Sequence, residues 1–247
     1  MKNKLFGLPL TICLALASAV PASASTFPTS VDTSSIQSSI NLNDSLSVES
    51  YKDWITSQIN MRNSNSYEAQ NFLNEFNNLT EDEQELFVSY INDSDLTLNI
   101  LNLLSTDEDY STLENGNIII SNDQTFQDKE TTVANRATIQ NRTATGTQSV
   151  TILGIKTFEY KGEIRYSHNG SSISGISHSN IWISRNFIPL VDFSWSNAST
   201  YGVGSSTARH INYCTWSFVH QSFGMTYGTH QIQISGNVKN QTTFTVK

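Results

Sequence analysis

The sequence has little of what most catalytic sites need. It holds only two cysteines, and just one of them, Cys214, lies outside the first 24 residues. No serine-centred elbow, phosphate-binding loop or calcium loop occurs, and no histidine or cysteine spacing matches a known metal site. A chain with a single remaining thiol cannot form an internal disulfide, so its stability must come from burial and hydrogen bonding. The sequence therefore predicts no metal site and no cofactor, and it assigns no reaction.

Long apolar runs are absent after the first two dozen residues. Within those residues, Lys2 and Lys4 precede an apolar stretch from Leu5 to Val20, and Ala22-Ser23-Ala24 offers small residues for cleavage. This order is typical of a secretory signal peptide over residues 1–24, in the short form that bacteria use. No later stretch approaches the ~18 apolar residues of a membrane span. We therefore expect a secreted, extracellular protein with no transmembrane segment.

Acidic residues are scarce in the second part of the chain. Residues 25–130 hold 19 Asp and Glu against 3 Lys and Arg, a balance of −16, whereas residues 131–247 hold 3 against 9, a balance of +6. All five histidines also lie in the second part. Opposite charges attract, so we predict intramolecular docking between the acidic and the basic half. Because histidines titrate near pH ~6.5, mild acid is expected to tighten that docking.

The acidic part carries helical periodicity. Residues 25–46 are rich in Ser, Thr and Asn and predict a disordered spacer. From 47 to 105, apolar residues recur three and four positions apart, as at Ala69, Phe72 and Phe76. Thr80 and Glu83 have the spacing of a capping box at a helix start. We predict a small acidic bundle of four short helices over 47–105, of the kind that serves as a pro-region. Residues 106–146 are polar and predict a linker with one candidate strand at Ile118–Ile120.

From residue 147 the apolar period changes to two. In residues 158–166, apolar side chains alternate with charged ones, and Gly162 marks a bulge or a close approach. Turn signals separate six to eight such segments at Asn169-Gly170, Ser196-Asn197, 202–206 and 235–237. The fold class expected is α+β by segregation, in which a small acidic helical bundle precedes a C-terminal, all-β antiparallel sandwich over 147–247.

Aromatic and histidine side chains near the turns are the best candidates for a binding site. Tyrosine and tryptophan among Asn, Ser and His suit the recognition of sugars or proteins. The alternative is that these strands bury both faces and that the same residues belong to the core. The expected partners are a glycan, a protein or an anionic surface outside the cell, and not nucleic acid. The predicted binding residues are Trp182, Tyr201, Tyr213, His210, His220 and His230.

Three functions remain open. The first is a secreted, non-enzymatic β-sandwich module that binds a cell-surface or extracellular target and is masked by the helical region until cleavage near Lys129, Arg136 or Arg142. In layout it is similar to secreted proteins of Gram-positive bacteria that join a helical pro-region to a β module, which is a likeness of architecture alone. The second is a membrane-damaging toxin or bacteriocin-like protein, in which segments 170–184 and 205–221 rearrange at a membrane. The third is a hydrolase that uses Cys214 and a histidine.

Overall fold

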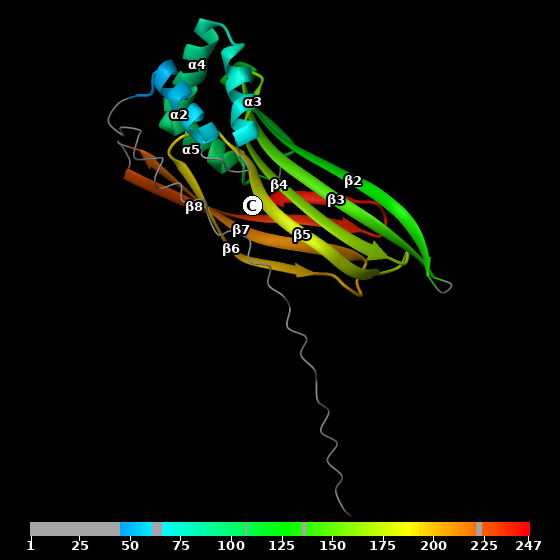
Figure 1. Ribbon diagram of the computed structural model, residues 1–247. Helices are drawn as coiled ribbons and strands as arrows, with labels where there is room; N and C mark the ends of the chain where they lie inside the picture. Colours follow the sequence, from blue (N-terminus) through cyan, green and yellow to red (C-terminus); the bar gives the residue numbers. More distant parts are fainter. Residues whose placement is uncertain (1–44, 61–65, 107, 135–136, 221–223) are drawn as a thin grey trace, which may run out of the picture. The chain divides into compact units, whose positions relative to one another are not determined.

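The fold separates helices from strands along the chain. The computed structural model describes residues 45–60, 66–106, 108–134, 137–220 and 224–247, of which 128–134, 137–138 and 220 are described by their backbone alone. In these residues, four helices precede nine strands that form two antiparallel sheets. Figure 1 shows the sheets as two layers, with the helices beside one end of the strands. The predicted fold class is confirmed. The expected signal peptide and most of the expected spacer lie outside the described residues.

The four helices follow the predicted periodicity and caps. They are α2 (Val48–Asn60), α3 (Ser66–Asn77), α4 (Glu81–Asn92) and α5 (Ser94–Leu103). The Thr80 hydroxyl accepts a hydrogen bond from the Glu83 amide, and the Glu83 carboxylate accepts one from the Thr80 amide, so the predicted capping box is confirmed. The Thr80 amide and hydroxyl both donate to the Glu83 carboxylate, and these two bonds lower the pKa of the Glu83 carboxyl. Asp93 caps α5 by accepting from the Leu96 amide.

Nine strands follow in two sheets, each with its strands in sequence order. The first sheet holds β1 (Tyr110–Leu113), β2 (Ile118–Ala134), β3 (Ala137–Ile152), β4 (Ile155–His168) and β5 (Ile173–Asn186). The second holds β6 (Val191–Tyr201), β7 (Thr207–His220), β8 (Gly224–Asn237) and β9 (Thr242–Val246). A single 3-10 turn, η1 (Glu114–Gly116), joins β1 to β2. This connectivity is a meander in both layers, because every strand pairs with its neighbour in sequence.

Most of the described residues between 106 and 146 form β1, β2 and the first part of β3 in the first sheet, where a linker was expected, and the predicted strand at Ile118–Ile120 is the start of β2. β2 pairs with β3 from Ile118 opposite Ile152 to Ala134 opposite Ala137. The stretch resembled a loop in sequence because an antiparallel strand needs apolar residues on one face at most. Among the described side chains of β2, only Ile118 and Ile120 are buried hydrophobics. Arg142, one of the expected cleavage positions, is buried within β3, and the side chains of Lys129 and Arg136 lie outside the description.

Of the predicted turns, the one at Asn169-Gly170 is confirmed and the one at Ser196-Asn197 is wrong. The Asn169-Gly170 turn joins β4 to β5, where the Asn169 side-chain oxygen accepts from the amides of Ser171 and Ser172. The Ser196-Asn197 turn is wrong, because these residues form a bulge within β6, with Asn197 in the left-handed region at φ 58°. Asparagine tolerates that conformation in a bulge as well as in a turn, so the local signal was ambiguous.

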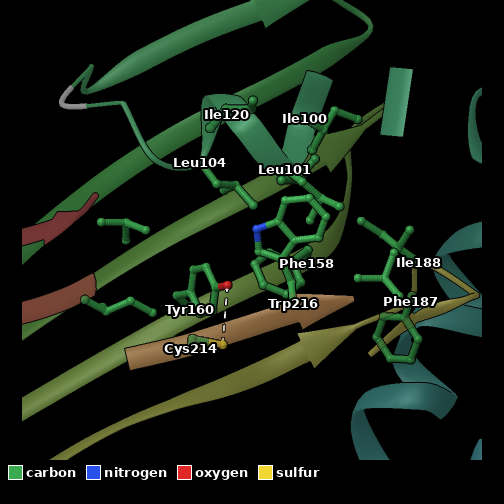
Figure 2. Packing of buried hydrophobic residues seen from close by; sticks show 14 of the residues in the cluster. Ile100, Leu101, Leu104, Ile120, Phe158, Tyr160, Phe187, Ile188, Cys214 and Trp216 are labelled. Atoms are coloured by element: carbon green, nitrogen blue, oxygen red, sulfur yellow. Dashed lines mark hydrogen bonds between the residues drawn. The ribbon is translucent and has the colours of Figure 1, made fainter. Parts of the chain in front are cut away.

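The core lies between the two sheets and continues under the helices. As predicted, Phe158, Tyr160, Ile164 and Tyr166 of β4 are buried (Figure 2 shows two of them). The expected close approach at Gly162 is also present. A Cβ atom there would lie 2.7 Å from Cε2 of Phe244, whose ring reaches across from β9. The glycine is therefore required by the packing of one layer on the other.

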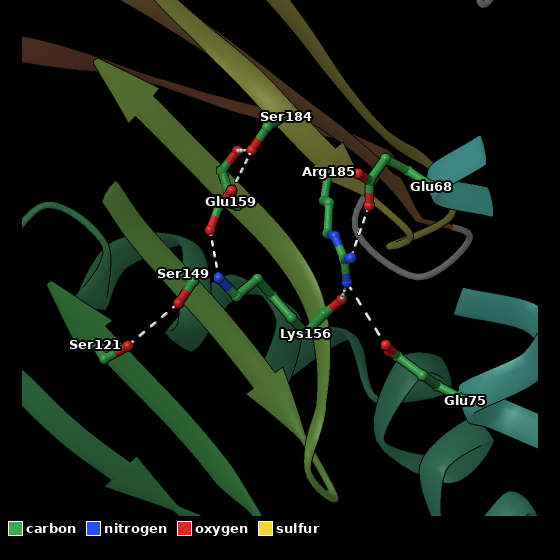
Figure 3. A network of polar contacts seen from close by, with 8 residues as sticks. All are labelled: Glu68, Glu75, Ser121, Ser149, Lys156, Glu159, Ser184 and Arg185. Carbon is green, nitrogen blue, oxygen red and sulfur yellow. Dashed lines mark hydrogen bonds and ion pairs between the residues drawn. The ribbon is translucent and has the colours of Figure 1, made fainter. Parts of the chain in front are cut away.

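The helices contact the sheets near the end of β5. The rings of Phe72 in α3 and Phe187 are stacked, with centroids 4.2 Å apart. Arg185 of β5 forms ion pairs with Glu68 at 2.7 Å and Glu75 at 3.9 Å (Figure 3). The contact between α3 and the end of β5 therefore combines a buried aromatic pair, Phe72 and Phe187, with a cluster of ion pairs around Arg185.

Candidate functional site

The outer face of the second sheet is polar, with aromatic side chains spread over it. Along β7, every second side chain from Ala208 to Phe218 is buried, and the alternate ones from Thr207 to Ser217 are partly or fully exposed. Cα pairing places the outward residues of β8 beside them, with Gln231 opposite Tyr213 and Tyr227 opposite Ser217. Tyr213 donates to the Gln231 side-chain oxygen at 3.2 Å. We call this surface the outer face.

One row of residues crosses the outer face at the end where β6 stops and β7 starts. Tyr201 pairs with Arg209, Arg209 with Ser235, and Ser235 with Thr243. Neighbouring strands are about 4.8 Å apart, so the row extends for roughly 14 Å. The Ser235 and Thr243 hydroxyls are hydrogen-bonded to each other. The row thus presents an aromatic ring, a guanidinium group and the exposed hydroxyl of Thr243, whereas Ser235 is 5% exposed.

A cleft of about 680 Å³ lies beside this row. Its walls are residues 124–126 of β2, Thr207 and Arg209 of β7, Ser235 and Asn237 of β8, and residues 240–243 at the start of β9. Nine of these eleven residues carry an amide or a hydroxyl group, and the other two are Phe126 and Arg209. Phe126 is 43% exposed and is the aromatic residue among those that line the cleft.

The turn that forms one wall of the cleft is held in place by buried groups. The Asn237 side-chain oxygen accepts from the amides of Lys239 and Gln241, and its amide group donates to the Gln241 side chain. From within the sandwich, Tyr166 donates its hydroxyl hydrogen to the Asn237 carbonyl at 3.0 Å, and Arg142 donates to the same carbonyl at 3.3 Å. The wall is therefore built before any ligand arrives, which reduces the entropic cost of binding.

The lining of the cleft is uncharged apart from Arg209. No carboxylate, histidine or cysteine is among its eleven lining residues, so no lining side chain titrates near neutral pH. The Thr242 hydroxyl oxygen is buried and has no hydrogen-bond partner in the described part of the chain. Buried polar atoms in proteins are normally paired, so this hydroxyl marks a place where a polar ligand or water would bond.

A second polar group of interest is a buried chain of four side chains between the sheets. Trp216 donates its indole hydrogen to Nε2 of His230 at 3.1 Å, and Nδ1 of His230 lies 3.2 Å from the Tyr160 hydroxyl. Tyr160 in turn donates to Sγ of Cys214 at 3.7 Å (Figure 2). An indole N–H can only donate, so Nε2 must accept, and the proton of the neutral imidazole sits on Nδ1.

Burial sets the protonation of this chain. Desolvation lowers the pKa of His230 to about 4, a shift that a bond to the Leu101 carbonyl in α5 partly opposes. Desolvation also raises the pKa of the Cys214 thiol to about 12, and burial raises that of Tyr160 well above its ordinary value. All three groups are therefore neutral at pH 7.

The predicted binding residues do not form one cluster. Tyr201 and Tyr213 lie on the outer face. Trp182 lies on β5 in the other sheet, opposite Lys161, whose ammonium is 5.8 Å from the ring centroid. His210 and His230 point into the interior, where the Thr200 hydroxyl lies 2.7 Å from Nδ1 of His210. The side chain of His220 lies outside the description.

Sequence reasoning missed most of the cleft. Phe126 fell in the expected linker and Asn237 in an expected turn at 235–237, and Gln241 was not singled out. Phe126 is the one aromatic residue in the polar stretch from Ser121 to Ala134, a signal that could have singled it out. Arg209 was passed over because it stood alone, whereas single, well-placed charges are common in binding sites.

Other searches of the molecule were negative. In the described residues, no group of three or more His, Cys, Asp and Glu side chains could hold a metal ion. None of the described helices is long and apolar enough to cross a membrane. Comparisons of the chain with protein-family models, with curated proteins and with solved structures found no match, so the function must be argued from the residues themselves.

Proposed function

We propose that this protein is a secreted, non-enzymatic binding module that recognises an extracellular glycan through the cleft beside β2 and β9. The observation that carries the proposal is the cleft's lining, in which nine amide or hydroxyl residues surround one exposed phenylalanine. Sugars present hydroxyl groups on their edges and apolar C–H faces above and below the ring. Amide and hydroxyl side chains bond to the former, and an aromatic ring packs against the latter.

Binding without hydrolysis is favoured by the absence of acid and base groups. A glycoside hydrolase needs two carboxyl groups that flank the scissile bond, and the cleft has none. Glu159 and Glu163 of β4 are on the opposite sheet, where they pair with Lys156 and Arg165. The cleft therefore supports recognition, and we assign it no reaction.

The environment of Cys214 argues against a hydrolase that uses this residue as its nucleophile. Its thiol is fully buried, and a pKa of about 12 leaves almost no thiolate at neutral pH. The histidine that pairs across from it, His230, is separated from the sulfur by the Tyr160 hydroxyl. A nucleophile and its base need direct contact and access to substrate, and these residues lack both.

The contacts of the helices with the sheets lie away from the cleft, which argues against masking of the cleft by the helices. The helical region touches Arg185 and Phe187 near the end of β5. Tyr201 and Arg209 of the row stand at the opposite end of the second sheet, because β6 begins at Val191 and runs away from those contacts. We therefore propose that the acidic helices brace the far end of the sandwich while the cleft stays open.

Binding to immobilised polysaccharides tests the proposal. The purified chain is expected to bind at least one member of a panel of neutral and acidic polysaccharides. Removing the aromatic surface in Phe126→Ala should weaken that binding about fivefold, the equivalent of about 1 kcal/mol. Tyr227→Ser is the matched control, since Tyr227 is 74% exposed on β8 of the second sheet and lies outside the cleft. Binding to no polysaccharide, or equal binding by wild type and Phe126→Ala, would remove the glycan proposal.

One observation favours the membrane alternative. Met225 and Tyr227, two positions apart on β8, are 66% and 74% exposed, and both lie on the outer face. Apolar and aromatic side chains of this kind enter the interfacial region of a bilayer. Under this alternative the purified chain releases dye from liposomes, and the double variant Met225→Ser/Tyr227→Ser releases much less. Intact liposomes at micromolar protein would leave the glycan proposal alone.

A further inference from the structure

We infer that the glycan bound by this cleft is acidic: its sugar or polyol units carry carboxylate or phosphate groups, and one of these groups binds to Arg209. The inference rests on the proposed function, since it names the class of glycan that the same cleft takes. It follows from the position of Arg209, from the charge around it and from its lack of a carboxylate partner among the residues that the structure describes.

Arg209 stands where a bound chain would pass. It pairs with Tyr201 on one side and Ser235 on the other, so it lies second in the row that crosses the outer face. It is also a lining residue of the cleft, and its side chain is exposed. A ligand that occupies the cleft and continues along the row therefore passes over the guanidinium group.

The charge of the cleft is opposite to that of the whole chain. The formal net charge at pH 7 is −8, yet Arg209 is the one charged residue among the eleven that line the cleft. Nearby charges act most strongly on a ligand, because salt screens interactions beyond about 8 Å. An acidic group in the cleft therefore meets the positive charge of Arg209 and no negative charge among the lining residues.

Three cations of the β region pair with carboxylates, and Arg209 differs from these three. Arg185 is paired with Glu68, Arg165 with Glu163, and Lys156 with Glu159. No carboxylate lies within 4 Å of the Arg209 guanidinium in the part of the chain that the structure describes. Its cross-strand neighbours are the uncharged Tyr201 and Ser235. Its donors are thus available to a ligand.

The chemistry of the neighbours selects a sugar acid over a simple anion. A guanidinium group binds a carboxylate or phosphate with two parallel hydrogen bonds. Thr243 adds an exposed hydroxyl group on the same row, which is hydrogen-bonded to the buried hydroxyl of Ser235, and Tyr201, 45% exposed, adds an aromatic surface on the other side of Arg209. A ligand that combines an acidic group with a hydroxylated ring uses all of these contacts, whereas inorganic phosphate uses the arginine alone.

Three monosaccharides of one scaffold test the inference: glucose, glucuronate and glucose 6-phosphate, titrated into the isotope-labelled chain and followed by NMR. The expected result is saturable shifts of the Arg209 Nε–H signal and of the Ser235 and Thr243 amides. Glucuronate or glucose 6-phosphate should bind at least about tenfold more tightly than glucose, the equivalent of one charge-assisted hydrogen bond. The two acidic probes distinguish carboxylate from phosphate as the group recognised.

Variants locate the effect. Arg209→Gln is expected to bring the affinities of the three sugars within about twofold of one another. Arg209→Lys, which keeps the charge but loses the two-pronged geometry, should lie between Arg209→Gln and wild type. Lys161→Gln removes one positive charge from the other sheet and should behave as wild type.

The outcomes are distinguishable. If the cleft signals shift equally with glucose and with the acidic sugars, the inference is wrong and the glycan proposal stands. If none of the three sugars moves the cleft signals, both are overturned. A preference for acidic sugars that survives in Arg209→Gln would also overturn the inference, because it would place the acidic group elsewhere.

Discussion

Acidification should destabilise this protein through His230 before its carboxylates titrate. The ring is 3% exposed, accepts from the Trp216 indole and lies beside the Tyr160 hydroxyl. Protonation would place a hydrogen on Nε2, facing an indole that can only donate, so one hydrogen bond would become a repulsion. The unfolded chain has no such restraint, and its histidine binds a proton near pH ~6.5.

The magnitude follows from the two pKa values. Burial lowers the pKa of His230 to about 4 in the folded protein. Between pH ~6.5 and pH ~4 the unfolded state binds more protons than the folded state, so the free energy of unfolding falls as the pH falls. The full loss is about 3 kcal/mol below pH ~4, and about 2 kcal/mol of it has occurred at pH 5. That is a large fraction of the stability of an average domain.

Urea unfolding, followed by tryptophan fluorescence at pH 7, 6 and 5, measures this loss. His230→Gln removes the titrating group but keeps an oxygen that can accept from Trp216. This variant should be less stable than wild type at pH 7, because its packing is poorer, yet lose about 2 kcal/mol less between pH 7 and pH 5. His178→Gln, a half-exposed histidine beside Glu163, is the control and should lose as much as wild type. An equal loss in His230→Gln and wild type would refute the reasoning.

This result would reverse an expectation drawn from the histidine count. Mild acid was expected to add positive charge to the β half and to tighten its docking with the acidic helices. Burial lowers the pKa of both His210 and His230, so neither gains charge readily while the protein is folded. The Leu101 carbonyl of α5 reaches His230. Protonation of His230 is therefore expected to destabilise the region where the sheets contact the helices.

Three further predictions concern packing, capping and reactivity. In urea unfolding, Gly162→Ala should lower the free energy of unfolding by about 1–3 kcal/mol, because the added Cβ meets the Phe244 ring. Gly175→Ala is the control, since its Cβ meets only the flexible Ser167 hydroxyl at 3.3 Å. It should change the free energy of unfolding by less than about 0.5 kcal/mol. Thr80→Ala should cost about 1 kcal/mol in thermal unfolding, and Thr80→Ser, which keeps the cap, should restore most of it. Cys214 should resist a thiol reagent at pH 8 in native buffer and react fully in 8 M urea, since its thiol is buried with a pKa of about 12; rapid labelling of the native protein would show that the sandwich opens.

Several features of this protein were readable from the sequence because they depend on near neighbours. A capping box needs Thr80 and Glu83 three positions apart, and both hydrogen bonds form within one turn. The inward face of β4 was readable because successive side chains on a strand point to opposite sides. The Asn169-Gly170 turn was readable because its bonds close within four residues. The segregated fold class follows from the change of apolar period along the chain.

Other features depended on partners that are distant in sequence. Phe126, Arg209 and Gln241 line one cleft only because β2 lies against β9 and β7 lies in the same sheet. The polar β2 became a strand because it could pair with β3 along its length, which no local pattern in β2 announces. His230 was offered as a surface ligand residue, but the layer above it buries the ring against Tyr160.

The division has a physical cause. Helix periodicity, caps and turns are decided by bonds between residues a few positions apart, so the sequence by itself determined the acidic helices, the alternation along the strands and the change from one to the other. Register, layer contacts and burial on the second face of a strand depend on which distant segments meet. Only the tertiary structure decided that His210 and His230 turn inward and that most of the expected linker forms strands of a sheet. It also decided that Arg209, which has no carboxylate partner among the described residues, stands in a cleft lined by no carboxylate.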